Sequence, residues 1–258
     1  MVNASEMDPD RSRSSVTMQG RFGHGEFTVA HASHVGCVRR NNEDSVAVHE
    51  SLGLGIVADG IGGQPGGEVA SRRAVHAIAR HVASGAGLVD AISLASRDLA
   101  RAGRRQGNSR PGTTVVATRL VGNAFRVAWV GDSRAYLLAD SVVRLTHDHS
   151  FVNVLKASGR ISDAQVGTHP MRNVLTRALG SVELKHPEIG SIDGQLRPNE
   201  HLLLCTDGLH GVLQDDGMHE IVRHAASVES AADALIAATL ERGAPDNVSL
   251  VLIGPVTA

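Results

Sequence analysis

The sequence predicts an α+β fold in which helices cover layers of antiparallel sheet. Apolar strand patterns come in runs and amphipathic helices come in pairs, an order typical of antiparallel sheets with helices on their outer faces. The chain has 258 residues, of which 42% are hydrophobic, enough for one large core. We therefore expect a single domain, residues 26–258, after a flexible tail at residues 1–25. The tail is rich in Ser, Arg, Asp and Gly, and it lacks the apolar segment of a secretory signal.

Hydrophobic periodicity predicts the individual elements in order. Strands are expected at 27–34, 45–48 and 52–58, followed by helices at 67–83 and 88–102. A meander of four strands is expected at 113–120, 125–130, 135–138 and 142–145. The polar, intermittently helical stretch 148–180 is either an excursion over the site or an ordinary surface loop. A strand at 201–206, helices at 217–225 and 230–242, and a strand at 247–253 complete the chain.

Composition excludes several classes of partner. The net charge is −2, and no run of Lys or Arg alternates with aromatic residues, so we expect no binding to nucleic acid. No apolar run approaches the roughly 18 residues that a membrane span needs, so we expect no membrane insertion. The two cysteines, Cys37 and Cys205, each lie beside apolar residues and are expected to be buried free thiols in a reducing compartment. A cytoplasmic monomer is the resulting expectation.

An acidic, glycine-rich turn at residues 59–68 is the centre of the sequence. Asp59 ends an apolar strand, and five glycines between Gly60 and Gly67 allow the backbone to approach a ligand closely. A dinucleotide site is the alternative, but the spacing G-x-G-x-x-G is not met after Asp59. A carboxylate there would also repel a pyrophosphate unless a cation lay between them. The turn therefore favours a cation between acid and phosphate.

Four aspartates share one placement, at the end of an apolar strand: Asp59, Asp132, Asp207 and Asp246. Any one of them alone is typical of a turn or a helix cap. If the strand ends bring them within roughly 5 Å, each pair repels by about 3 kcal/mol at an effective dielectric constant near 20. Metal ions would offset that repulsion, and an oxygen-only ligand set selects Mg²⁺ or Mn²⁺ over zinc.

A second acidic pair, Glu43 and Asp44, follows Arg39 and Arg40 closely. By itself, this arrangement is typical of an ordinary surface ion pair. Beside a metal cluster, Arg39 would instead bind phosphate, because its guanidinium offers a bidentate fork to phosphate oxygens.

In order along the chain, these motifs resemble the phosphatase 2C type of metal-dependent protein serine/threonine phosphatase, as found in bacteria. The resemblance covers nearly the whole chain after Phe27. The segments that carry it are 39–45 (RRNNEDS), 57–68 (VADGIGGQPGGE), 112–114 (GTT), 130–134 (VGDSR), 145–149 (LTHDH), 172–180 (RNVLTRALG), 206–209 (TDGL) and 246–249 (DNVS).

The resemblance implies a four-layer αββα sandwich with two central antiparallel sheets, and a mobile flap at about 148–180. It also implies that Asp59 and the Gly60 carbonyl ligate two Mn²⁺ or Mg²⁺ ions, that Asp207 and Asp246 complete one site, and that Glu43 and Asp44 hold metal-bound waters. Asp132 with Asp207 would match a third ion. The implied activity is hydrolysis of phosphoserine and phosphothreonine in proteins by a metal-bound hydroxide, with Arg39, Asp59 and Asp207 as catalytic residues. The partners would be substrates of a serine/threonine kinase, in signalling.

Two positions depart from the resemblance. Some relatives carry a histidine directly after the Asp-Gly pair and many bacterial ones carry it three residues further on, where this chain has Ile61 and Gln64. A general acid from this loop is therefore not expected, and a water on a third ion, His147, His149 or bulk water are the alternatives.

Other classes explain the sequence less well. An inert phosphoprotein-binding scaffold conflicts with the intact set Asp59, Asp207 and Asp246. A zinc hydrolase built on His147-Asp148-His149 lacks the further ligands it would need downstream. A haloacid-type phosphatase would need a second aspartate two residues after Asp59, where the chain has Ile61.

Overall fold

The protein forms two antiparallel sheets between two pairs of helices, in a computed structural model that describes residues 14–18, 22, 27–61, 66–105, 112–180 and 188–255. The first sheet has the order β1 (Ser14–Met18), β2 (Phe27–His34), β12 (Val248–Pro255), β11 (His201–Cys205), β8 (Arg134–Leu138) and β9 (Val142–Arg144). The second has the order β10 (Gly190–Gln195), β7 (Ala124–Val130), β6 (Val115–Val121), β4 (Leu54–Ile61) and β3 (Asp44–His49), and β5 (Gly112–Thr113) pairs with β4.

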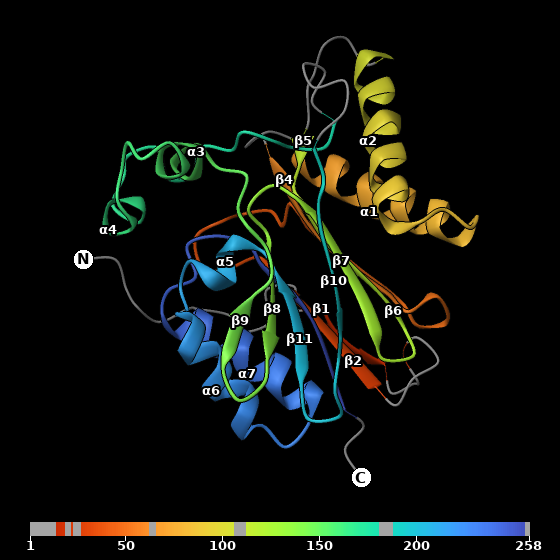
Figure 1. Ribbon diagram of the computed structural model, residues 1–258, viewed down its shortest axis with the longest axis vertical. Helices are drawn as coiled ribbons and strands as arrows, with labels where there is room; N and C mark the ends of the chain where they lie inside the picture. The colour runs from red at the N-terminus through yellow and green to blue at the C-terminus, as the bar shows by residue number, and fades with distance from the viewer. Residues whose placement is uncertain are drawn as a thin grey trace.

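Helix pairs form the two outer layers, as Figure 1 shows. The first pair, α1 (Gly67–Ala83) and α2 (Leu88–Arg105), covers the second sheet, and the other pair, α6 (Asp215–His224) and α7 (Val228–Glu241), covers the first sheet. Each helix buries an apolar stripe, which for α1 includes Ala70, Ala74 and Ile78. The predicted α+β sandwich is confirmed.

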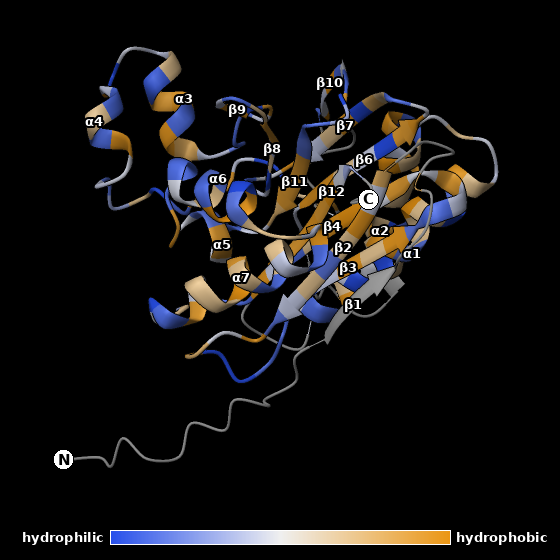
Figure 2. Cartoon of the chain, turned by 90° about the horizontal axis from the view of Figure 1, so that it is seen from below, coloured by the Kyte–Doolittle hydropathy of each residue, from blue (hydrophilic) through white to orange (hydrophobic). Residues whose placement is uncertain are grey.

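Three apolar layers hold the sandwich together. One lies between α1, α2 and the second sheet, one lies between the two sheets, and one lies between the first sheet and α6 and α7. Figure 2 shows the corresponding concentration of hydrophobic residues along the central strands. Aliphatic residues dominate all three layers, as the low aromatic content requires. Among the helices that the structure describes, none has the length and apolar composition to cross a bilayer.

Short helices lie where the sequence shows only patches of helical pattern. The 148–180 segment contains α3 (Phe151–Ala157) and α4 (Asp163–Val166), and Figure 1 shows both set to one side of the sandwich. Isolated bridges from Ser150 to Leu175 and from Thr113 to Leu179 close the base of this segment. A further single turn, α5 (Asp207–His210), and a 3-10 turn at Glu50–Leu52 complete the described helices.

Three expectations need correction. Residues 14–18 lie inside the predicted flexible tail, yet they form β1, which pairs with β2. Strand β10 is missed because its sequence, Gly-Ser-Ile-Asp-Gly-Gln, has little apolar alternation. Cys37 is exposed, because the turn at Gly36 brings it to the surface, whereas Cys205 is buried as predicted.

Candidate metal centre

Strands β3 and β4 bring the first two carboxylates together. Asp44 and Asp59 are direct partners in the antiparallel ladder, so their side chains project from the same face of the sheet. Asp44 is only 8% exposed. Burial, with the charges of Asp207 and Asp246, raises its pKa to about 7, although Ser249 and Thr206 donate hydrogen bonds to it. Burial also raises the pKa of Asp59 well above its ordinary value, and the charge of Asp44 adds to this effect.

The first sheet contributes two more carboxylates from neighbouring strands. Asp207 follows β11 and Asp246 precedes β12, and these two strands pair directly. Burial raises the pKa of Asp207 to about 6, with a further increase from the charge of Asp246. Thr206 joins the two sheets at this point, because its Oγ1 donates to Oδ2 of Asp44 at 3.0 Å.

Asp132 enters the site from the turn between β7 and β8. The preceding residue, Gly131, has a φ of +106°, and a Cβ there would lie 2.7 Å from Cβ of Thr114, so only glycine fits. Burial raises the pKa of Asp132 to about 7, and the nearby charges of Asp207 and Asp148 act in the same direction. The buried ring of His210 contacts the Asp132 carbonyl through Nε2 at 3.1 Å.

The aspartates from both sheets therefore form one interacting group. The pKa of Asp59 is raised by burial and then by the charges of Asp44, Asp207, Asp132 and Asp246. Within the described ranges, no three Asp, Glu, His or Cys side chains are arranged closely enough to coordinate one metal ion together. The donors are oxygens throughout, which fits a hard divalent cation such as Mg²⁺ or Mn²⁺.

Gly60 and Glu43 lie beside the start of α1. A Cβ on Gly60 would lie 2.3 Å from the carbonyl oxygen of Gly67, so the close approach of the two backbones requires glycine. A Cβ on Gly67 would lie 2.9 Å from the Gly60 carbonyl oxygen and 2.6 Å from Oε2 of Glu43. The Glu43 carboxylate and the Gly60 carbonyl oxygen thus both lie beside Gly67 at the start of α1. Gln64, whose position departs from the motif, lies outside the described residues.

Arg39 lies at the rim of the site. Its Nη2 donates to Oδ2 of Asp246 at 2.7 Å, and its side chain is 52% exposed. The hydrogen bond to Asp246, together with the charges of Asp246, Glu43 and Asp207, raises the pKa of Arg39. A half-exposed guanidinium beside the carboxylates can meet an incoming phosphate without being buried first.

Two groups of polar side chains, not assigned roles from the sequence, hold the ligands in place. Asn247 accepts from the Glu43 amide at 2.8 Å and donates to the carbonyls of Val35 and Asn41. Thr113 donates through Oγ1 to the Asp59 carbonyl at 2.8 Å, and Thr114 Oγ1 accepts from the Asp59 amide at 3.1 Å. These residues are the Asn of D-N-V-S and the threonines of G-T-T, so they lie inside the motifs although their contacts do not follow from the motifs alone.

The base of the 148–180 segment is fixed next to Asp132. Nε and Nη2 of Arg134 donate to both carboxylate oxygens of Asp148, at 3.0 and 2.8 Å. Burial alone would raise the pKa of Asp148, but the bonds to Arg134 and the charge of Arg144 lower it. His149 accepts from the Gly131 amide through Nδ1 at 3.2 Å, and its ring stacks on Trp129 with centroids 6.3 Å apart.

Neither of the partly buried histidines near Asp132, His149 and His210, is suited to act as a cationic acid at neutral pH. Burial, followed by the charge of Arg177, lowers the pKa of His149 to about 4. Burial, followed by the charge of Arg134, lowers the pKa of His210 to about 3. Among the alternatives for the proton donor, the low pKa argues against His149. His147 is exposed, and its carbonyl accepts a hydrogen bond from Nε1 of Trp129 at 2.9 Å.

The family model for protein phosphatase 2C matches residues 27–248 of this chain. The protein belongs to the phosphatase 2C family. A serine/threonine phosphatase, stp, of Listeria monocytogenes is 33% identical over 245 residues, which cover 89% of this chain and 95% of that protein.

Solved structures of phosphatase 2C relatives share the fold. The crystal structure of the Mycobacterium tuberculosis serine/threonine phosphatase PstP/Ppp superposes with a TM-score of 0.80 at 33% identity, covering 89% of this chain and 98% of that one. The catalytic domain of PstP in complex with two manganese ions gives a TM-score of 0.77 at 32% identity, covering 90% and 99%. The four-layer sandwich is thus shared with metal-binding phosphatases.

Proposed function

We propose that this phosphatase 2C member is a metal-dependent protein serine/threonine phosphatase. The observation that carries the proposal is the group of five aspartates, Asp44, Asp59, Asp132, Asp207 and Asp246, which both sheets direct to one place. Burial is the largest cause of the raised pKa values of the first four, and Asp246 lies at the more exposed edge of the group. Two Mn²⁺ or Mg²⁺ ions, with a third at Asp132 and Asp207, are the cofactors. Bound there, they supply an acidified water and neutralise charge on the phosphate. The PstP relative with two manganese ions supports this assignment.

Each part of the site has a separate task in the proposed reaction. Asp59, Asp207, Asp246 and the Gly60 carbonyl hold the ions, and Glu43 and Asp44 orient the waters around them. Arg39 positions the substrate phosphate through its guanidinium, and it exchanges its bond to Asp246 for the incoming oxygens. Phosphate ester hydrolysis then depends on positioning and electrostatic stabilisation more than on covalent chemistry by the protein.

The substrates are phosphorylated proteins that a serine/threonine kinase modifies, and the enzyme acts as a cytoplasmic monomer. The relatives named as serine/threonine phosphatases support the class of substrate. The half-exposed Arg39 at the rim is compatible with a phosphorylated side chain that projects from a protein surface.

Metal-dependent hydrolysis of p-nitrophenyl phosphate and of a phosphothreonine peptide tests the proposal. Activity should appear on adding Mn²⁺ or Mg²⁺ to chelator-treated protein and disappear again with excess chelator. Full activity after thorough chelation, or activity with Zn²⁺ alone, would contradict it. Phosphoprotein binding with no turnover at any metal concentration would favour a scaffold instead.

A further inference from the structure

A row of charged residues crosses the helix-facing side of the second sheet, away from the metal centre. In the strand ladders, Leu54 of β4 is the partner of Arg119 on β6, Arg119 is the partner of Arg126 on β7, and Arg126 is the partner of Asp193 on β10. Two arginines therefore stand directly opposite each other on neighbouring strands, an arrangement that is destabilising unless something compensates it.

Only one of the two arginines is compensated within the described part of the chain. Arg126 makes a bidentate ion pair with Asp193, through Nε and Nη2, each at 2.6 Å. Arg119 makes no hydrogen bond or ion pair with any described residue, and its Nε is buried without a partner. A buried N–H group without an acceptor costs free energy, so an unpaired guanidinium nitrogen here points to a missing acceptor.

A pocket of about 380 Å³ lies at this position. Arg119, Arg126 and Asp193 supply its charges, and Leu88 and Val121 supply its apolar wall. The volume is within the range of about 300–1,000 Å³ usual for small-molecule sites. Arg119 is five residues along β6 from Thr114, which contacts Asp59, so the pocket is roughly 17 Å from the metal centre at about 3.3 Å per residue. Arg119 is two residues from the end of β6 that lies away from β5, and Figure 1 shows this end of the strand.

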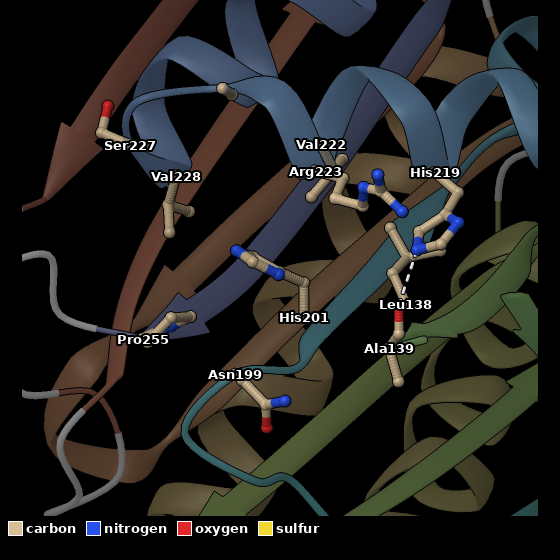
Figure 3. Close-up of a pocket in the computed structure, with 11 residues that line it drawn as sticks. Leu138, Ala139, Asn199, His201, His219, Val222, Arg223, Ser227, Val228 and Pro255 are labelled. Atoms are coloured by element: carbon tan, nitrogen blue, oxygen red, sulfur yellow. Dashed lines mark hydrogen bonds between the residues drawn. The ribbon is translucent and has the colours of Figure 1, made fainter. Parts of the chain in front are cut away.

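The other helix layer contains a smaller pocket, of about 210 Å³, shown in Figure 3. His201, His219 and Arg223 line it, and Nε2 of His219 is already bonded to the Ala139 carbonyl at 2.6 Å. The buried side-chain atoms without a partner in the described residues are Nδ1 of His31 and Nε of Arg119, neither of which lines this smaller pocket. The Arg119 pocket is therefore the stronger candidate for a ligand.

We propose that the pocket at Arg119 binds a small organic anion that carries an apolar group. Arg119 is the charged anchor, because its guanidinium offers a planar donor fork to a carboxylate or phosphate. The apolar part of the ligand packs on Val121, which is 60% exposed, next to Leu88. With two arginines and one aspartate, the charges in the lining sum to +1, which favours an anion over a cation.

Binding of benzoate to the isotope-labelled full chain tests this site by amide chemical shifts. Benzoate combines a carboxylate with an apolar ring, benzamide is its neutral isostere, and acetate lacks the ring. Benzoate should bind with a dissociation constant on the order of 1 mM, and benzamide and acetate should bind at least about tenfold more weakly. The shifted amides should include Gly87, Leu88 and Gly194, which line the pocket.

Variants separate this site from general anion binding. Arg119→Gln should weaken benzoate binding about tenfold, as expected for losing a charge-assisted bond worth about 1.4 kcal/mol. Arg119→Lys, which keeps the charge but not the fork, should weaken it less. The matched control is Arg242→Gln. Arg242 is an exposed arginine directly after α7, and its Nη1 donates to the Ala238 carbonyl. The Arg242→Gln variant should bind benzoate like the parent chain.

Three results would overturn the site. Shifts centred on other residues, or equal benzoate binding by the parent chain and Arg119→Gln, would exclude Arg119 as the anchor. Acetate binding as tight as benzoate would mean an adventitious ion only. Loss of folding in both Arg119 variants would show that the guanidinium is structural. None of these readouts requires phosphatase activity, so they are independent of the proposed function.

Discussion

The two ends of the sheet formed by β3, β4, β6 and β7 both bring like charges onto neighbouring strands, but they differ in burial. At one end, Asp44 faces Asp59 and is 8% exposed. At the other end, Arg119 faces Arg126, whose side chain is 50% exposed. The buried pair has strongly raised pKa values, whereas in the other pair Asp193 compensates Arg126 and Nε of Arg119 stays without a partner in the described residues. Burial therefore determines how strongly each end requires an external ion of opposite charge.

The largest expected effect is at the acidic end. Asp59→Asn should lower kcat about a thousandfold or more, because a lost metal ligand removes several kcal/mol of transition-state stabilisation. In the metal-free protein the same change should raise the melting temperature, since it removes one repelling charge. Kinetics with Mn²⁺ and thermal unfolding in chelator measure both effects. The exposed turn residue Asp140 provides the control variant, Asp140→Asn, which should change neither.

The pH dependence of metal-free stability sharpens the same comparison. The pKa values of Asp44 and Asp132 are raised from 3.8 to about 7 in the folded state. Because the folded state holds these protons more tightly than the unfolded state, stability is greatest below about pH 4 for these groups and is lost as pH rises through about 7. Urea unfolding in chelator should show a loss on the order of a few kcal/mol between pH 5 and 8. Stability that stays constant or increases over this interval would contradict the assignment.

Asp132 tests the identity of the proton donor. An aryl phosphate leaves as a stable anion, whereas a serine or threonine alkoxide needs a proton as it departs. If the donor is a water held at Asp132 and Asp207, Asp132→Asn should lower kcat on a phosphothreonine peptide roughly tenfold more than on p-nitrophenyl phosphate. Equal losses on the two substrates would assign Asp132 to metal assembly, and His147 or bulk water would then supply the proton.

Arg39 is one of the cations that the chain itself supplies to the acidic end, and the charge of Arg134 also acts on Asp132 and Asp207. If Arg39 positions the phosphate and does not hold the ions, as proposed, Arg39→Ala should raise KM about tenfold and change kcat little. Steady-state kinetics with Mn²⁺ separate the two parameters. A loss confined to kcat would place Arg39 in the chemical step instead.

Asp193 is the corresponding anion at the basic end, and the smallest effect is expected there. Asp193→Asn leaves two facing arginines uncompensated, so the melting temperature should fall slightly at low salt and recover at high salt, where the repulsion is screened. The same change should modestly tighten benzoate binding, because Arg126 is released from its partner. An unchanged melting temperature at low salt would show that the facing arginines do not interact appreciably.

Helices and strands with a regular apolar pattern were predictable from the sequence. Strands that are held mainly by pairing with another strand were not. The helix at 67–83 is predicted with its observed bounds because its apolar spacing is regular. Strand β10 and the Ser14–Met18 strand carry little apolar signal and are held by pairing with β7 and β2, so only the tertiary structure reveals them. The exposure of Cys37 likewise depends on the turn at Gly36.

The candidate ligands could be predicted from the sequence because each aspartate follows or precedes an apolar strand. The order of the motifs along the chain also matched a known family. Their mutual approach depends on strand order, which places β11 beside β12 and β3 beside β4. The roles of Asn247 and Thr206 could not be read from local pattern, since each acts on a residue more than 160 positions away. The Arg119 pocket was also not foreseen, because its charges come from three strands.

The position of β12 has a consequence for synthesis of the protein on the ribosome. This strand lies between β2 and β11, and Asn247 just before it fixes the Glu43 amide, 204 residues earlier in the chain. At roughly 5–20 residues per second, the segment that carries Glu43 and Asp44 waits on the order of ten seconds or more for this partner. A nascent chain therefore cannot complete its ligand set, and it should not remove phosphate from any protein until β12 has left the ribosome.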